Sequence, residues 1–140
     1  MTIQLNTTLR NTMVSQYEST IGVSPKLILR SGAAPANAAA VDSGTLLAIL
    51  TLPSDWMAAA ASGAVTMLGT WAGTGAAAGT IAHYRLKDST APSTDNTGTT
   101  YEQGTVTATG GGGDLTLDNV VVAVSQAINI TSWTRTQGGA

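Results

Sequence analysis

The single histidine, His83, is the side chain whose type could most readily transfer a proton near neutral pH. A histidine base needs a carboxylate that orients its ring and a nucleophile within reach. The alternating pattern that starts at Thr80 instead places Arg85 and Lys87 on the same strand face, and these cations disfavour a charged imidazole. We therefore interpret His83 as a solvent-facing strand residue, not as a catalytic base.

The residues that usually bind metal ions are scarce. The chain has no cysteine and one histidine, so a zinc site would need three carboxylates or water, and no such spacing is visible. The absence of cysteine also excludes disulfides and cysteine nucleophiles. We predict no metal ion.

Two groups of carboxylates have spacings that could support chemistry. Asp114 and Asp118 lie four residues apart on a predicted strand, and Asp88, Asp95 and Glu102 flank one loop. Paired carboxylates serve glycoside hydrolysis, and clustered ones bind calcium. The loop lacks the ordered D-x-D-x-D-G pattern of a calcium loop, and turn residues with solvated charge are the commoner interpretation. We therefore predict no catalytic residue and no enzyme, with a glycan hydrolase as the third-ranked hypothesis.

Two glycine-rich segments resemble nucleotide loops only superficially. The segment 73–79 is not followed by a helix and an acidic residue, and 110–113 leads into Asp114-Leu115 and not into Gly-Lys-Ser/Thr. Both are better explained as bends that need positive φ or close backbone approach. We predict no cofactor.

The aromatic residues are few and allow two interpretations. A β-sandwich can present aromatic side chains as a sugar-binding platform or as an interface anchor, but packing in the core is at least as common. The sequence does not assign them individually. They are Trp56, Trp71, Trp133, Tyr17, Tyr84 and Tyr101.

The composition indicates a surface that is nearly free of charge. Only 10% of the 140 residues are charged, whereas about a quarter of the residues are charged in an average soluble domain. The formal net charge is −2. Threonine, serine, alanine and glycine must cover the surface instead, and a weakly charged surface favours association. The six basic residues form no block, so direct nucleic-acid binding is not expected.

The chain shows no targeting or membrane segment. Its first residues lack the basic start and apolar stretch of a secretion signal, and no run approaches the ~20 apolar residues that span a bilayer. We expect a product made in the cytoplasm that does not bind membranes.

The N-terminal segment predicts the one clear helix. The spacing matches a helix that buries one apolar stripe, made of Leu9, Met13, Val14, Tyr17 and Ile21. Thr7 or Thr8 is expected as the N-cap and Gly22 as the end of the helix. The alternative is an arm that becomes ordered only on a neighbouring protein. The expected division is an arm or short helix at 1–22 and a β-sandwich domain at 23–140.

The rest of the chain predicts short strands. The continuously apolar run 45–52 is expected to be buried on both sides, and 80–109 to form a hairpin with a long exposed tip at 88–100. A short helical segment is expected at 54–61 and a surface loop at 33–44. Seven or eight strands favour a mainly all-β fold: a sandwich, jelly roll or small barrel. The predicted strands cover 26–30, 45–52, 64–71, 80–87, 101–109, 114–119, 120–124 and 127–135.

Short strand and turn motifs run through nearly the whole chain. They are Leu9-Arg10-Asn11, Leu29-Arg30-Ser31-Gly32 with Ala34-Pro35-Ala36, Leu52-Pro53-Ser54-Asp55-Trp56-Met57, Gly69-Thr70-Trp71, His83-Tyr84-Arg85-Leu86-Lys87-Asp88, Gly104-Thr105-Val106-Thr107 and Gly113-Asp114-Leu115-Thr116-Leu117. With these motifs the chain resembles the capsid cement, or decoration, proteins of tailed bacteriophages, including those of Bordetella phages.

The resemblance implies a jelly-roll-like β-sandwich on the exterior of the virion capsid. Such a protein associates with itself as a dimer or trimer and bridges neighbouring copies of the major capsid protein. The motifs are structural, so no functional residue carries over. The alternative function is a phage tail or fibre domain that binds a cell-surface glycan through exposed Trp or Tyr.

Overall fold

The computed structural model describes residues 2–91 and 98–140. It confirms a mainly β protein with one N-terminal helix, α1 (Thr7–Ile21). The described residues form eleven strands, more than the seven or eight expected, because several predicted strands are divided into shorter ones. The strands are β1 (Lys26–Arg30), β2 (Leu46–Thr51), β3 (Ala64–Thr66), β4 (Trp71–Thr74), β5 (Gly79–Thr80), β6 (His83–Lys87), β7 (Thr100–Ala108), β8 (Leu115–Leu117), β9 (Val121–Val122), β10 (Ala127–Ile130) and β11 (Thr134–Thr136).

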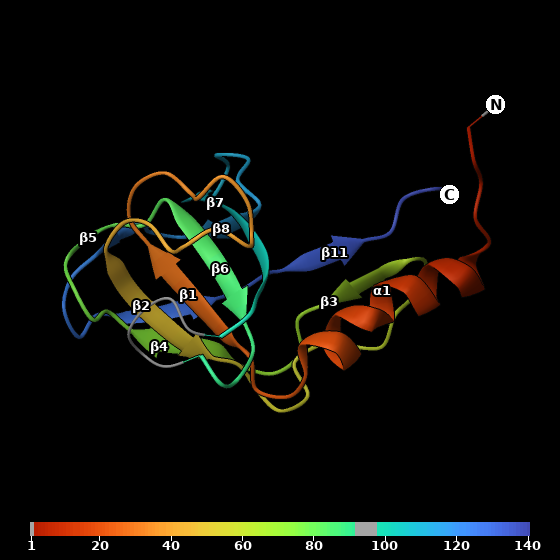
Figure 1. Cartoon of the computed structure of the whole chain (residues 1–140), viewed down its shortest axis with the longest axis horizontal. Coiled ribbons are helices and arrows are strands. Elements are labelled where there is room, and N and C mark those ends of the chain that lie inside the picture. Colours follow the sequence, from red (N-terminus) through yellow and green to blue (C-terminus); the bar gives the residue numbers. More distant parts are fainter. Residues whose placement is uncertain (1, 92–97) are drawn as a thin grey trace.

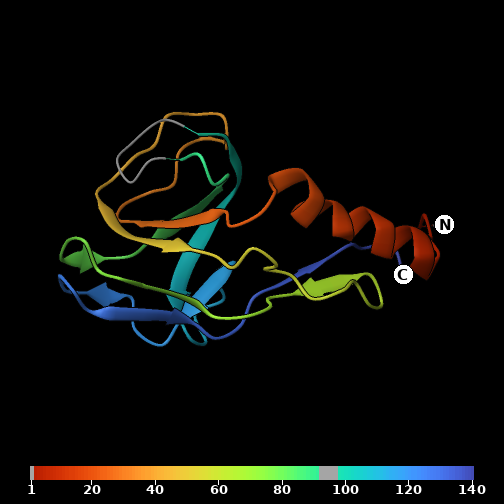
Figure 2. The same ribbon diagram turned by 90° about the horizontal axis from the view of Figure 1, so that it is seen from below.

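Five strands form one curled sheet in the order β2-β1-β6-β7-β8 (Figure 2). Its pairs are antiparallel except β7 with β8, which are parallel. The predicted hairpin is present as β6 and β7, although residues 92–97 of its tip lie outside the described residues. Three two-stranded sheets, β4–β10, β3–β11 and β5–β9, complete the fold. The result is a half-barrel sheet with small hairpins.

The core follows from the apolar strands. Leu27 and Leu29 of β1 are buried. On β2, Leu47 and Leu50 are buried as the apolar run at 45–52 predicts, but Leu46 and Ile49 are only partly buried. On β6, Tyr84 and Leu86 point into the same core, which confirms the expected alternation. This core continues without a break to Val14 and Ile21 of α1.

The helix α1 is capped by Asn6, not by Thr7 or Thr8. The Asn6 side chain accepts a hydrogen bond from the Leu9 amide at 2.8 Å, and an asparagine caps a helix at least as well as a threonine. At the other end, Gly22 donates its backbone N–H to the Glu18 carbonyl, as expected for the helix end.

Beside α1 lies the β3–β11 ribbon, and these three elements, α1, β3 and β11, form an arm that projects from the half-barrel (Figure 1). Both chain ends lie at the far end of this arm (Figure 1). There the Leu5 amide donates to the Gly139 carbonyl at 2.7 Å. Leu5 and Gly139, near the two ends of the chain, are therefore held together at the tip of the arm.

The predicted helix at 54–61 is wrong. Ala58 donates to the Thr66 carbonyl and Ala61 to the Ala64 carbonyl, so this segment lies extended along β3. The turn between them is Ser62-Gly63, and both of these residues have positive φ, as a tight hairpin requires. The pairing with β3 outweighs the helix propensity of four alanines.

Three predicted strands are interrupted. The strand at 80–87 becomes β5 and β6, which pair with β9 and with β1 and β7. The strand at 64–71 becomes β3 and β4, because Leu68 donates to the Trp56 carbonyl and leaves the ribbon. The strand at 127–135 becomes β10 and β11, which pair with β4 and β3. An unbroken strand would place Trp133 on the face opposite Ile128 and Ile130, but the break turns it into the same core.

Candidate interaction surface on the helix

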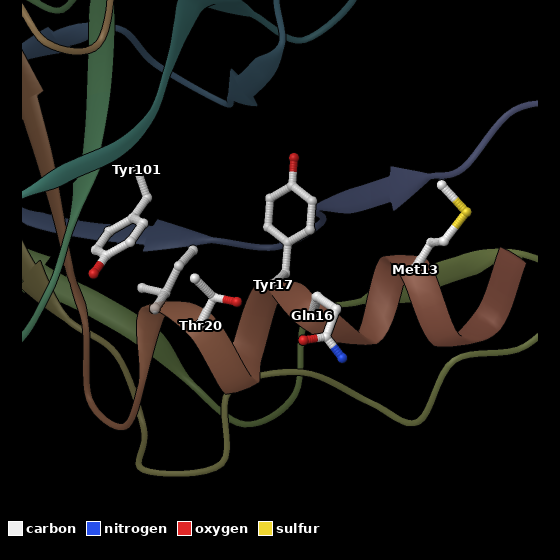
Figure 3. A pocket seen from close by; sticks show the side chains of 6 residues that line it. Met13, Gln16, Tyr17, Thr20 and Tyr101 are labelled. Atoms are coloured by element: carbon white, nitrogen blue, oxygen red, sulfur yellow. The ribbon is translucent and has the colours of Figure 1, made fainter. Parts of the chain in front are cut away.

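A groove of about 240 Å³ lies where α1 leaves the half-barrel (Figure 3). The helix α1 forms one wall of the groove. Tyr101 of β7 lies at the end of the groove opposite Met13 (Figure 3). The lining is mostly apolar, with Gln16 and Thr20 as neutral polar groups. The complete lining is Met13, Gln16, Tyr17, Thr20, Ile21 and Tyr101.

Both charged residues of α1 bind the rest of the chain. Arg10 donates to the Gln137 and Ser62 carbonyls, each at 3.0 Å. Glu18 accepts from the backbone amides of Trp56 and Met57 at 2.9 and 3.3 Å. The solvent-facing side of α1 is therefore left with neutral residues.

Apolar side chains nevertheless protrude from this neutral face. Leu9 is 47% exposed and Met13 is 42% exposed, and Tyr101, at the end of the groove away from Met13 (Figure 3), is 39% exposed. Buried Val14 and Ile21 form a different face of the same helix, packed on the core. Exposed apolar residues that gather at one groove mark a contact surface.

A polar joint fixes the orientation of this surface. Arg135 of β11 donates to Glu102 of β7 and to the Tyr84 hydroxyl of β6, and Tyr84 also donates to Glu102. Burial, and then the negative charge of Glu102, raises the pKa of Tyr84. Burial alone would lower the pKa of Arg135, but the hydrogen bond and charge of Glu102 raise it. Arg135 therefore stays charged, and Tyr84 stays a neutral phenol.

The three tryptophans pack together beneath the joint. Trp133 lies 6.0 Å from Trp56 and 5.3 Å from Trp71 between ring centroids, and Tyr17 of α1 meets it edge-on at 6.3 Å. All three tryptophans are buried, so they are core residues and cannot form a glycan platform. Among the tyrosines, Tyr101 is the exposed one.

The position of His83 corrects the prediction. It does lie on the face of β6 away from the core, together with Arg85 and Lys87, but all three are buried. The expected surface loop at 33–44 folds over this face, and Arg85 donates to the carbonyls of Ala38 and Ala40. Alternation identified the face, but the loop removed it from solvent.

Asp42, from this loop, is the centre of the buried charges. Its carboxylate lies 2.5 Å from Arg85, 2.7 Å from Lys87 and 3.2 Å from Arg30. Burial alone would raise the pKa of Asp42, but the hydrogen bond from Lys87 and the three cations lower it. His83 completes the cluster through a 2.9 Å bond between Nδ1 and the Gly32 carbonyl, and burial lowers its pKa.

The other candidate carboxylates serve turns or lie apart. Asp114 accepts from the backbone N–H and the hydroxyl of Thr105, both at 2.8 Å, and the backbone bond lowers its pKa. Asp118 is exposed. Asp88 accepts from Thr90 and Thr99, whereas Glu102 belongs to the joint, and Asp95 lies outside the described residues. Within 2–91 and 98–140, no group of three potential ligands could hold a metal ion.

Sequence reasoning missed Asp42 and Arg135. No spacing rule links either residue to its partners. The partners of Asp42 lie 12 to 45 residues away in sequence, and Arg135 is 33 residues from Glu102. The available signal was scarcity, because four of the six basic residues lie on β6 and its neighbour β1. Such a concentration in a chain with few charges favours an internal acidic partner. No helix in the described part of the chain is long and apolar enough to cross a membrane.

Comparisons with known proteins give no relative. No family model, no curated protein and no solved structure matches this chain.

Proposed function

We propose that this protein is a structural protein of a tailed-phage virion, which cements or decorates the capsid exterior by bridging neighbouring major capsid proteins and by associating with itself. The observation that carries the proposal is the projecting arm, whose exposed helix face is neutral and carries Leu9 and Met13. Such a surface loses little hydration on contact with protein.

The use of the charged groups supports a structural role. Arg135 and Glu102 hold the arm, Asp42 holds the loop over β6, and Arg10 and Glu18 hold α1. Because these charged groups pair within the fold, the surface is covered largely by threonine, serine and alanine. Such a surface suits broad and flat contacts between proteins.

The capsid location and a jelly-roll-like arrangement come from the resemblance of the strand and turn motifs. A cement protein that binds only the assembled shell stabilises that shell by mass action. Many weak contacts suffice, because each copy that touches two neighbours gains from multivalency.

The test is the copy number in purified particles of the phage that encodes the chain, measured by quantitative mass spectrometry against the major capsid protein. We expect a number comparable with that of the capsid protein, and particles without the chain should open at a lower temperature. A few copies for each particle would contradict a shell location and indicate the tail.

A truncation tests the contribution of the N-terminal end. Removing residues 2–5 leaves the Asn6 cap and the Arg10 bonds intact, so the fold should persist. Lower occupancy on particles is expected if this end of the arm contacts the shell. A deletion of residues 1–10 would remove those bonds too and could not separate binding from folding.

A further inference from the structure

The exposed stripe on α1 has the spacing of a helix–helix seam. Leu9, Met13, Gln16 and Thr20 follow one another at intervals of four, three and four residues. This pattern has a period of about 3.5 residues and places all four side chains along one line of a helix. All four are exposed or line the groove, so the stripe is an unpaired seam.

The charge of the occupant follows from the charge of the stripe. The stripe offers no charged group, since Arg10 and Glu18 are bound internally. A partner that pressed charged side chains against it would bury them without a counter-charge, which is costly. The same stripe on a second copy of this chain is neutral as well, and it carries two apolar side chains that need cover.

The geometry also makes the stripe complementary to itself. In an antiparallel pair of helices centred between Met13 and Gln16, Leu9 of each copy lies opposite Thr20 of the other. Thr20 lines the groove beside Tyr17 and Tyr101 (Figure 3). The groove of about 240 Å³ has room for an aliphatic side chain, whereas a water molecule takes roughly 30 Å³.

We infer that two copies of the chain pair across a two-fold axis through this stripe, and that Leu9 of each copy enters the groove of the other. The arm projects from the half-barrel (Figure 1), so a second helix can reach α1. The inference rests on the self-association in the proposed function and names its surface. One helix seam is below the ~1,200 Å² of a stable interface, so we expect a weak dimer in solution that becomes effective on a shell.

Disulfide trapping tests this pairing, because the chain has no native cysteine. In the variant Leu9→Cys/Thr20→Cys, the two sulfurs of one helix are eleven residues, or about 16 Å, apart. A disulfide needs Cα atoms within about 7 Å, so any disulfide must join two chains. We expect a covalent dimer on mild oxidation at up to about 1 mM protein.

The matched control is Thr8→Cys/Ser19→Cys, which has the same spacing on a different exposed face of α1. The Leu9/Thr20 variant should cross-link at least about tenfold faster, since pairing holds its thiols at a high effective concentration. Equal rates, or no covalent dimer from either variant, would overturn the inference. Circular dichroism of the reduced variants establishes that both are folded.

Sedimentation equilibrium gives a second readout. Leu9→Glu should raise the dimer dissociation constant at least about thirtyfold, the effect of losing an interface hot spot, while Thr12→Glu on another face should leave it unchanged. A chain that stays monomeric at every concentration would contradict the pairing. Because these measurements use the isolated chain, their failure leaves the copy number in particles to decide the virion role separately.

Discussion

Arg135 on β11 donates its Nε–H to both carboxylate oxygens of Glu102 on β7, at 3.0 and 2.9 Å. Arg135 also lies 4.5 Å above the Trp133 ring. The two strands belong to different sheets, so this ion pair links the arm directly to the curled main sheet. The arm that carries α1 is therefore held to the main sheet by a pair whose residues are 33 positions apart in sequence.

Arg135→Lys should destabilise the protein by about 1–3 kcal/mol. Lysine keeps the charge, but it loses the planar fork that binds a carboxylate at two points and stacks on an indole. Urea denaturation of the wild type and the variant measures the difference. Asp55→Asn, at an exposed site, is the control and should change stability little. If Arg135→Lys unfolds at the same urea concentration as the wild type, the guanidinium fork contributes nothing to stability.

The sequence predicts α1 and the β6–β7 hairpin better than it predicts the Arg135–Glu102 ion pair that links the arm to the main sheet. The apolar spacing of α1 and the alternation of Tyr84 and Leu86 predict the helix and the hairpin. The expectation that one helical stripe from Leu9 to Ile21 is buried is wrong in its first half, because Val14 and Ile21 are buried whereas Leu9 and Met13 are exposed. The pairing of β11 with β3 was not predictable, because it depends on where Trp133 finds space in the core. Without that pairing, nothing places Arg135 beside Glu102.

Asp42→Asn should destabilise the protein by about 3–5 kcal/mol. The substitution leaves the buried cations of Arg30, Arg85 and Lys87 without the carboxylate that they share, and breaking a buried ion pair from one side has a cost of this size. Urea denaturation measures the loss, and hydrogen exchange at residues 38–42 should accelerate as the loop detaches. Asp118→Asn, on the surface, is the control. Unchanged exchange in the loop would contradict a role of Asp42 in holding the loop.

The contribution of Asp42 should weaken in acid. The pKa of Asp42 is lower in the folded than in the unfolded chain, so its contribution is complete above the unfolded value of about 3.9 and is lost as the pH falls through the folded pKa. Unfolding free energies measured from pH 5 to pH 2 should fall in the wild type. The fall should be shallower in Asp42→Asn, and parallel curves would remove Asp42 from the acid transition.

His83 should make stability depend on pH in a separate window. Burial lowers the folded pKa, and Arg30 and Arg85 oppose a charged ring more than Asp42 favours it. The unfolded chain therefore binds the extra proton first, so stability is complete above about pH 6.5 and falls as the pH drops below it, by at most ~1.4 kcal/mol per pH unit. His83→Gln should flatten the curve between pH 7.5 and 5.5. Because the chain has one histidine, NMR can follow it, and an imidazole that titrates at or above pH 6.5 would contradict the burial effect.

The His83 strand also shows what a period of two can and cannot predict. Alternation correctly separates His83, Arg85 and Lys87 from the core-facing Tyr84 and Leu86. It contains no information about the outer face, which the loop at 33–44 covers through hydrogen bonds to Arg85. That loop has no periodic pattern, and Asp42, its one charged residue, resembles any surface charge in the sequence.

Three glycines allow steric crowding to be separated from backbone strain. A Cβ at Gly75 would lie 2.2 Å from the Ala123 carbonyl oxygen, whereas Gly110 has φ of +87° but nothing within 4 Å, and Gly138 is open with no positive φ. We expect Gly138→Ala to be neutral and Gly110→Ala to cost about 1–2 kcal/mol from the left-handed backbone. Gly75→Ala should cost about 3 kcal/mol or more, because backbone must move.

Thermal or urea unfolding of the three variants measures their losses of stability and so tests this order. The sequence predicts that the glycine-rich segments 73–79 and 110–113 serve close approach or positive φ, and Gly75 and Gly110 represent one requirement each. A Gly110→Ala loss as large as that of Gly75→Ala would mean that the turn after β7 is crowded as well as strained. A neutral Gly75→Ala would mean that β4 and the 121–126 segment lie farther apart than a methyl group requires, and the close approach would then not be the reason for glycine at that position.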